Sequence, residues 1–250
     1  YWGLALLDPS HPTLILKTDR TRCVPCFHEI TPPMPAVPNQ LWEITSLSLR
    51  VSGAAVVLSS AVGIPCGVWL AFSRPKYRRS LSVLVHTGMA LPPVVVGLFL
   101  YLMLSRSGPL GNLSWLYEPA AMITAQFILS VPFVIGVTAA AVAAVPGELV
   151  WQLRSLGATP WQTRLTVLRE ARAGVALAVA TAFGRSISEV GAVMIVGGNV
   201  EHHTRVLTTS IVLETRQGHF ALALWLSAML LMIAVLVNVV IVRAQGRLPA

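Results

Sequence analysis

The chain has 250 residues, of which 55% are hydrophobic and 11% are charged, and its formal net charge is +8. Charged residues make up about a quarter of an ordinary soluble domain, so this composition and a mean hydropathy of +0.71 exclude that class and indicate a membrane protein. The basic residues stand in short blocks beside apolar runs, as in juxtamembrane loops, so we expect no nucleic-acid partner.

Residues 1–40 differ from the rest of the chain. They contain seven of its seventeen prolines and both of its aspartates, which is typical of disordered sequence. We expect a disordered N-terminal extension here, which is either an unstructured lead-in or sequence outside the native protein. Cys23 and Cys26 have the spacing of half a zinc site, but no second pair follows, so we interpret them as incidental and expect no metal site.

Five apolar runs are long enough to cross a membrane, which takes roughly 20 helical residues. The runs cover residues 51–72, 81–104, 119–144, 173–197 and 220–242. We therefore predict an all-α membrane protein with five transmembrane helices over residues 41–245, followed by a short cytoplasmic tail at 246–250.

The lysines and arginines predict the orientation of these helices, because positively charged loops stay in the cytoplasm. The loops after the first, third and fifth runs hold ten of these residues, whereas the loops after the second and fourth runs hold three. We expect a multi-pass protein of the inner cell membrane, with its N-terminus outside and its C-terminus in the cytoplasm.

The sequence offers no convergent set of catalytic groups. No aspartate follows Asp19, and the patterns GxxxxGK[ST], HExxH and GxSxG are all missing. We therefore expect a chain that is not an enzyme, with no catalytic residues and no cofactor of its own. If it moves a solute uphill, the energy must come from another subunit or from an ion gradient.

A polar segment interrupts the apolar pattern at residues 145–172. Apolar residues recur at helical spacing around Leu153, Leu156 and Trp161, and the sequence Gly-Ala-Thr-Pro at 157–160 breaks the run. This pattern predicts a short helix, a tight turn at Gly157 and a second helix. On composition alone, the segment could also lie on the lipid surface as an amphipathic hairpin.

This segment resembles the EAA loop of binding-protein-dependent ABC importer permeases, whose pattern is Glu-Ala-Ala, three residues, Gly, nine residues, Ile, one residue, Leu-Pro. Gly157 stands at the glycine and Val167 at the isoleucine, whereas Trp151 replaces the glutamate and Glu170 replaces the proline. The resemblance implies a coupling helix that fits a groove on an ATPase subunit. The residues that it assigns to this contact are Arg154, Leu156, Gly157, Ala158, Thr159, Pro160 and Trp161.

Two further segments resemble tungstate importer permeases, a branch of the same family. They are residues 90–97 with 105–111, and residues 184–192 with 197–206; molybdate and sulfate permeases carry looser versions. Over residues 41–245 the resemblance implies a type I ABC importer permease core (MetI-like) that imports an oxyanion, most closely tungstate. It also implies a homodimer, two cytoplasmic ATPase subunits that bind the ATP, and an extracytoplasmic oxyanion-binding protein. A non-transporting membrane assembly protein is the alternative from a different class.

Pro92 and Pro93 interrupt the second apolar run. Proline has no backbone N–H, so these two residues leave carbonyl groups without helix partners in the membrane. Such groups are tolerated where the backbone lines a wet cavity or is buried in protein. Both a solute pathway and a simple packing kink fit this pattern.

Arg185 and Glu189 stand four residues apart in the fourth run, where one helix face would hold them as an ion pair. Charged groups inside a membrane are functional candidates by default. The pair is either structural or part of an anion pathway. In the pathway, Arg185 supplies positive potential, Ser186 and Ser188 donate hydrogen bonds, and Glu189 restrains Arg185 or a gate.

The predicted outer loop at 198–218 carries a group of polar residues. Adjacent histidines without nearby partners are more often solvated than bound to a metal, so we expect no metal here. We interpret the polar residues as a docking site for the solute-binding protein. They are Asn199, His202, His203 and Arg205.

Overall fold

The structure is a computed structural model that describes residues 38–244. It is helical throughout, with no strand among the described residues, which confirms the predicted all-α class. Most of the predicted N-terminal extension and the predicted tail at 246–250 lie outside the described residues. Residues 38–40 already belong to helix α1 (Pro38–Ala71), which begins three residues before the predicted boundary at 41.

Among the described residues, three helices are long and apolar enough to cross a membrane, namely α1, α4 (Pro119–Ala143) and α10 (Phe220–Ala244). Two other apolar runs are divided into bent helix pairs. The helices α2 (Pro75–Met89) and α3 (Pro93–Leu104) meet at 88°, and α7 (Arg172–Ser188) and α8 (Gly191–Gly197) meet at 56°. If each pair is one span, the described residues contain five spans, as predicted, but the second and fourth are broken.

Local sequence explains both breaks. Pro92 has an extended backbone (ψ 125°), which ends the helical conformation before α3. Pro93 is the first residue of α3, where a backbone N–H would make no hydrogen bond within the helix, so proline is tolerated there. In the other pair, Glu189 has an extended backbone (ψ 126°) directly after the last residue of α7. The first break is therefore three residues long, and the second is two residues long.

Helices α1 and α4 pack through small residues. Gly63 and Gly67 stand one turn apart on α1. A Cβ atom added at Gly63 would lie 2.7 Å from Cβ of Val134, and one added at Gly67 would lie 2.8 Å from the carbonyl oxygen of Ile135. Only glycine permits this approach, which is the small-residue packing found between membrane helices.

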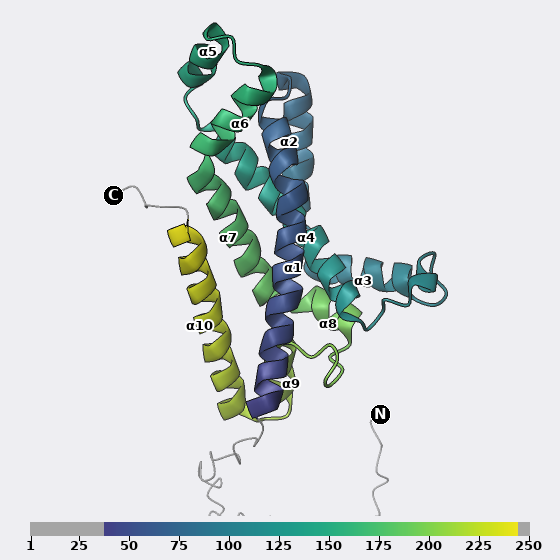
Figure 1. The fold of residues 1–250 in the computed structure, drawn as a ribbon. Helices are drawn as coiled ribbons and strands as arrows, with labels where there is room; N and C mark the ends of the chain where they lie inside the picture. Colours follow the sequence, from purple (N-terminus) through teal and green to yellow (C-terminus); the bar gives the residue numbers. More distant parts are fainter. Residues whose placement is uncertain (1–37, 245–250) are drawn as a thin grey trace, which may run out of the picture.

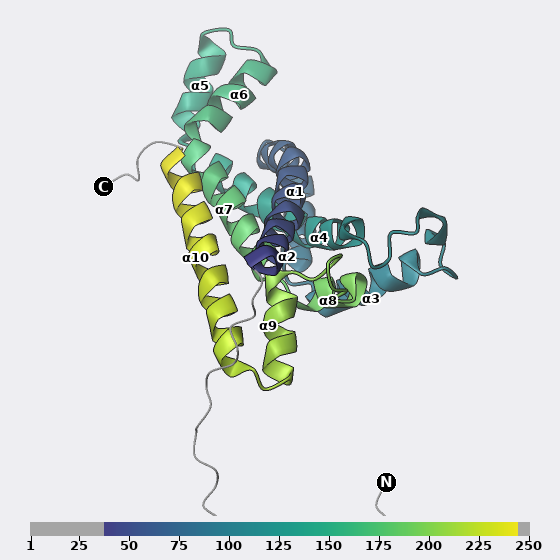
Figure 2. The same ribbon diagram turned by 60° about the horizontal axis from the view of Figure 1, so that its bottom comes forward.

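The other elements surround this pair. Helix α10 runs beside α7 (Figure 1) and contributes apolar side chains to a cluster around Phe183, but most of its length is left uncovered by the described chain. Helices α3 and α8 lie to one side, with the short 3-10 helix η1 (Gly111–Leu113) after α3. Helices α5 (Gly147–Ser155) and α6 (Pro160–Glu170) lie at one end and α9 (Leu207–Arg216) at the other (Figures 1 and 2).

Candidate functional site

The α5–α6 hairpin, residues 147–170, has the predicted form of two helices joined at a tight turn. Gly157 has a φ of +79°, a left-handed conformation that favours glycine, and the N–H of Ala158 donates to the carbonyl of Leu153. Thr159 caps α6, because its Oγ1 accepts from the N–H of Gln162 (3.3 Å) while its own N–H donates to Oε1 of Gln162 (2.8 Å). Pro160 fills the first position of α6.

The hairpin presents large apolar side chains that the described chain leaves uncovered. Trp151, Leu156 and Trp161 are 72%, 83% and 71% exposed, and Arg154 is exposed beside them. No residue of α5 is buried, whereas α6 is anchored by Val167, which packs against the ends of α1 and α4. The hairpin is thus fixed at its base and open along its outer side.

The two helix breaks lie against each other. A Cβ atom added at Gly191, the first residue of α8, would lie 2.9 Å from Cγ2 of Val94 in the first turn of α3. One added at Gly97 would lie 2.8 Å from Cα of Ala192, so α3 and α8 pack almost backbone to backbone (Figure 1). The predicted pathway segment Pro92–Pro93 therefore stands close to the break after α7, although the two are far apart in sequence.

The predicted hydrogen-bond donors Ser186 and Ser188 lie in different environments. Ser186 is buried, its Oγ lies 2.8 Å from Oγ of Ser130, and its carbonyl accepts a hydrogen bond from Nε2 of Gln126 (2.9 Å). Ser188 is exposed, and its hydroxyl donates to the carbonyl of Gly184 (2.8 Å). Only Ser188 is open to a solute in this conformation.

Gln126 and Ser130, both on α4, were not singled out from the sequence. They hold the last turn of α7, and Oε1 of Gln126 is buried without a hydrogen-bond partner. The available signal was their four-residue spacing inside an apolar run, which places two polar side chains on one helix face.

The expected ion pair between Arg185 and Glu189 is not formed. Because α7 ends at Ser188, Glu189 leaves the helix face that carries Arg185, and its Oε1 instead accepts a hydrogen bond from the N–H of Ala192 (3.3 Å). The guanidinium carbon of Arg185 lies 4.4 Å from the centre of the Phe133 ring, which is a cation–π contact. Its Nε is buried without an acceptor. In the part of the chain that the structure describes, Arg185 has no carboxylate partner.

The predicted docking residues lie in the loop between α8 and α9. Nδ1 of His202 is 2.9 Å from Oε2 of Glu43 on α1, and Nε2 of His203 is 2.9 Å from Oε1 of Glu118, directly before α4. All four side chains are about half exposed, so each ion pair contributes less than about 1 kcal/mol. The adjacent histidines therefore point to two different helices rather than to one ligand.

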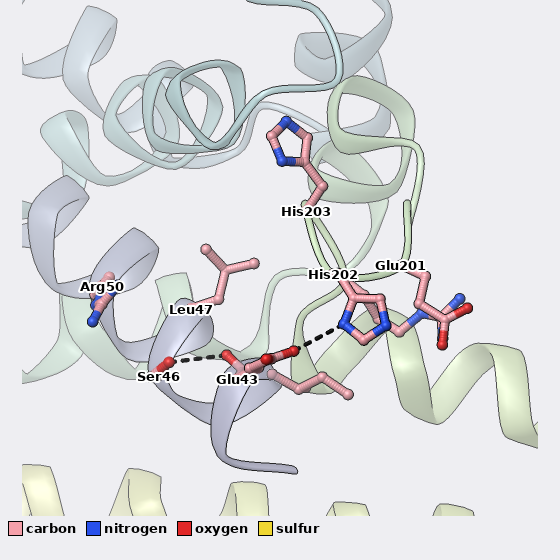
Figure 3. A pocket seen from close by; sticks show the side chains of 9 residues that line it. Glu43, Ser46, Leu47, Arg50, Glu201, His202 and His203 are labelled. Atoms are coloured by element: carbon pink, nitrogen blue, oxygen red, sulfur yellow. Dashed lines mark hydrogen bonds and ion pairs between the residues drawn. The ribbon is translucent and has the colours of Figure 1, made fainter. Parts of the chain in front are cut away.

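A pocket of about 190 Å³ lies between this loop and α1 (Figure 3). Nη1 of Arg205 lies 3.4 Å from Oε1 of Glu201 at its edge, and Asn199 turns the chain after α8 with a φ of +52°. Within residues 38–244, no group of three or more His, Cys, Asp or Glu side chains is placed to hold a metal ion. The pocket is lined by Glu43, Ile44, Ser46, Leu47, Arg50, Glu201, His202, His203 and Arg205.

Comparison with known proteins finds relatives over most of the chain. It is 44% identical to the probable anion ABC transporter permease protein of Haloferax volcanii over 215 residues, which cover 84% of this chain and 92% of the relative. It is 41% identical to the tungstate uptake system permease protein TupB of Peptoclostridium acidaminophilum over 206 residues, or 82% and 90% of the two chains. The molybdenum transport system permease protein ModB of Azotobacter vinelandii is 29% identical over 199 residues, or 76% and 88%.

Solved ABC transporters share the fold. The inward-facing MetNI methionine ABC transporter matches with a TM-score of 0.65 and 21% identity, over 83% of this chain and 95% of that chain. A bacterial alginate ABC transporter in complex with an alginate pentasaccharide-bound periplasmic protein matches with a TM-score of 0.67 and 20% identity, over 81% and 77%. The family model described as binding-protein-dependent transport system inner membrane component matches residues 63–249. The chain therefore belongs to this family and is a permease subunit of an ABC importer.

Proposed function

We propose that this permease carries an oxyanion, tungstate before molybdate or sulfate, across the inner membrane into the cytoplasm. The observation that carries the proposal is Arg185, whose charge has no carboxylate partner among the described residues and which stands in the last turn before the helix break. A doubly charged oxyanion needs positive charge and hydrogen-bond donors rather than carboxylates. The 41% identity to a tungstate uptake system permease supports the same solute class.

Five spans of one chain are too few to enclose a pathway, so the working unit is a homodimer with the pathway between the two copies. The breaks at Pro92–Pro93 and after Ser188 lie along this pathway and form its gate, with Ser186 and Ser188 as donors and Glu189 fixing the start of α8. Irregular backbone is tolerated at membrane depth where it lines such a path.

The energy comes from two cytoplasmic ATPase subunits, which bind the ATP, while this chain binds no cofactor of its own. The uncovered side chains Trp151, Leu156 and Trp161 suit a groove on such a subunit. Only Ala171 separates α6 from α7, so a displacement of the hairpin reaches the last turn of α7, where Arg185 stands. This chain of elements links ATP-driven movement to the gate.

This role places the hairpin and the C-terminus in the cytoplasm and the N-terminus outside. The loop with Asn199, His202, His203 and Arg205 lies at the end of the bundle away from the hairpin (Figure 1) and receives the oxyanion-binding protein. The distribution of basic residues in the sequence supports this orientation.

Reconstitution into liposomes with the ATPase and the binding protein tests the proposal. We expect tungstate to stimulate ATP hydrolysis and uptake more than molybdate or sulfate does. Arg185→Ala should abolish this stimulation, whereas Arg216→Ala, which removes an exposed arginine from α9, should leave it intact. A larger response to molybdate would identify molybdate, rather than tungstate, as the solute. No response to any of the three anions would refute the proposal of an oxyanion importer.

A further inference from the structure

An apolar groove lies between α1 and α6. Figure 1 shows α6 at the end of the bundle that carries the α5–α6 hairpin. Its volume is about 160 Å³. Arg164 is the one charged residue in its lining, which is otherwise almost entirely hydrocarbon and aromatic. The lining residues are Ile64, Pro65, Val68, Trp69, Trp161, Arg164, Leu165 and Leu168.

The charge of Arg164 is not neutralised within the described part of the chain. Its guanidinium carbon lies 6.0 Å from the centre of the Phe72 ring, and no carboxylate lies within ion-pair distance of it there. The segment 73–80, which begins two residues after the end of α1, adds four exposed basic residues and no acidic one. This corner of the molecule is therefore complementary to an anion that also carries apolar groups.

The level of the groove in the membrane follows from α1. The α1 residues that line the groove lie between Ile64 and Trp69. Since α1 ends at Ala71, the groove lies beside the last turns of a membrane-spanning helix. Trp69, on the α1 wall of the groove, is exposed. Tryptophan is enriched where hydrocarbon meets headgroups, which places the groove at that boundary.

We propose that this groove binds one anionic phospholipid. An acyl chain lies against Ile64, Val68 and Leu168, and the phosphate contacts the guanidinium of Arg164. A protein partner fits this site less well, since one charge in an apolar slot offers few specific contacts, whereas basic pockets beside membrane helices suit lipid headgroups. The bound lipid bridges α1 and α6 at the base of the hairpin. An effect of the lipid on ATPase coupling rests on the proposed function, whereas the binding of the lipid does not.

Native mass spectrometry of the full-length chain, released from nanodiscs of equal phosphatidylglycerol and phosphatidylcholine, tests this site. We expect the wild type to retain phosphatidylglycerol preferentially, and Arg164→Gln to lower that retention about fivefold, the effect of one basic residue near an anionic surface. Arg164→Lys should keep most of it, and Arg216→Gln, which removes a charge at the other end of the molecule, should keep all of it. Equal retention of both lipids, or full retention by Arg164→Gln, would overturn the proposal.

A photo-crosslinking amino acid in place of Leu165 identifies the occupant directly. Crosslinks to phospholipid support the site, whereas crosslinks to an ATPase subunit or to a second copy of the chain would show that protein covers the groove. Both measurements are independent of uptake. If the reconstituted transporter imports no oxyanion, the proposed function is refuted, whereas the lipid site is still decided by lipid retention and crosslinking.

Discussion

The turn at Gly157 provides a direct test of the coupling role that we propose for the α5–α6 hairpin. Its φ is +79°, and no heavy atom lies within 4 Å of a Cβ atom built there, so Gly157→Ala causes no collision and has only a conformational cost. A left-handed conformation costs a residue with a side chain about 1–2 kcal/mol, which is roughly a 5- to 30-fold change in an equilibrium constant. We expect the fraction of hairpins in the docking conformation to fall by up to that factor.

Gly218, between α9 and α10, is a matched control. Its φ is +84°, and no heavy atom lies within 4 Å of a Cβ atom built there either, so Gly218→Ala introduces the same strain at the other end of the bundle. The assay is oxyanion-stimulated ATP hydrolysis in proteoliposomes, with the thermal unfolding midpoint measured in parallel. Both variants should unfold at similar temperatures, and only Gly157→Ala should lose stimulation.

Gly157→Pro should uncouple the complex fully, because proline fixes φ near −65° and removes the N–H that donates to the carbonyl of Arg154 (3.0 Å). The hairpin tip is exposed, so the protein should still insert into the membrane. Normal uptake by this variant, or equal uncoupling by Gly218→Ala, would refute the assigned role of the turn.

Three further predictions concern other parts of the molecule. Gly67→Ala should lower the free energy of unfolding by about 1–3 kcal/mol, because its Cβ would lie 2.8 Å from the carbonyl oxygen of Ile135. Gly53→Ala should not lower it, because no heavy atom lies within 4 Å of a Cβ atom built there. Equal thermal unfolding midpoints of the two variants would contradict the close packing of α1 and α4. Leu156→Ser should abolish co-purification of the ATPase without changing that midpoint, since the side chain is 83% exposed, and an intact complex would exclude Leu156 from the contact. His202→Ala should weaken capture of the binding protein in a pull-down. It should cost less than about 1 kcal/mol of stability, because the ion pair of His202 with Glu43 is exposed. Unchanged capture would show that His202 is not part of the docking site.

The sequence was most informative where local chemistry decides the structure. The turn at Gly157 and the helix that starts at Pro160 follow from residues within a few positions of each other, and the structure contains both. The five apolar runs likewise follow from composition. The resemblance to the EAA loop pointed to the family that the comparisons confirm.

The prediction failed where it assumed that a helix continues. The expected pair of Arg185 and Glu189 needs an unbroken helix, but α7 ends between them, and a four-residue spacing then no longer places two side chains on one face. Gln126 was missed for a different reason, since its partner Ser186 is 60 positions away in sequence. Contacts of this kind depend on how helices pack and leave little trace in local composition.

The glycines that join α1 to α4 restrict how this protein can move. At Gly63 and Gly67 α1 contributes no side chain to the contact, and the atoms of α4 that face these glycines include Cβ of Val134 and Cβ of Thr138. No rotamer change moves a Cβ atom, so none could let one helix slide along the other. A shift of one residue would drive a Cβ atom into the opposing helix. We expect α1 and α4 to stay fixed relative to each other through the transport cycle. The movement is then confined to the two broken spans, α2–α3 and α7–α8.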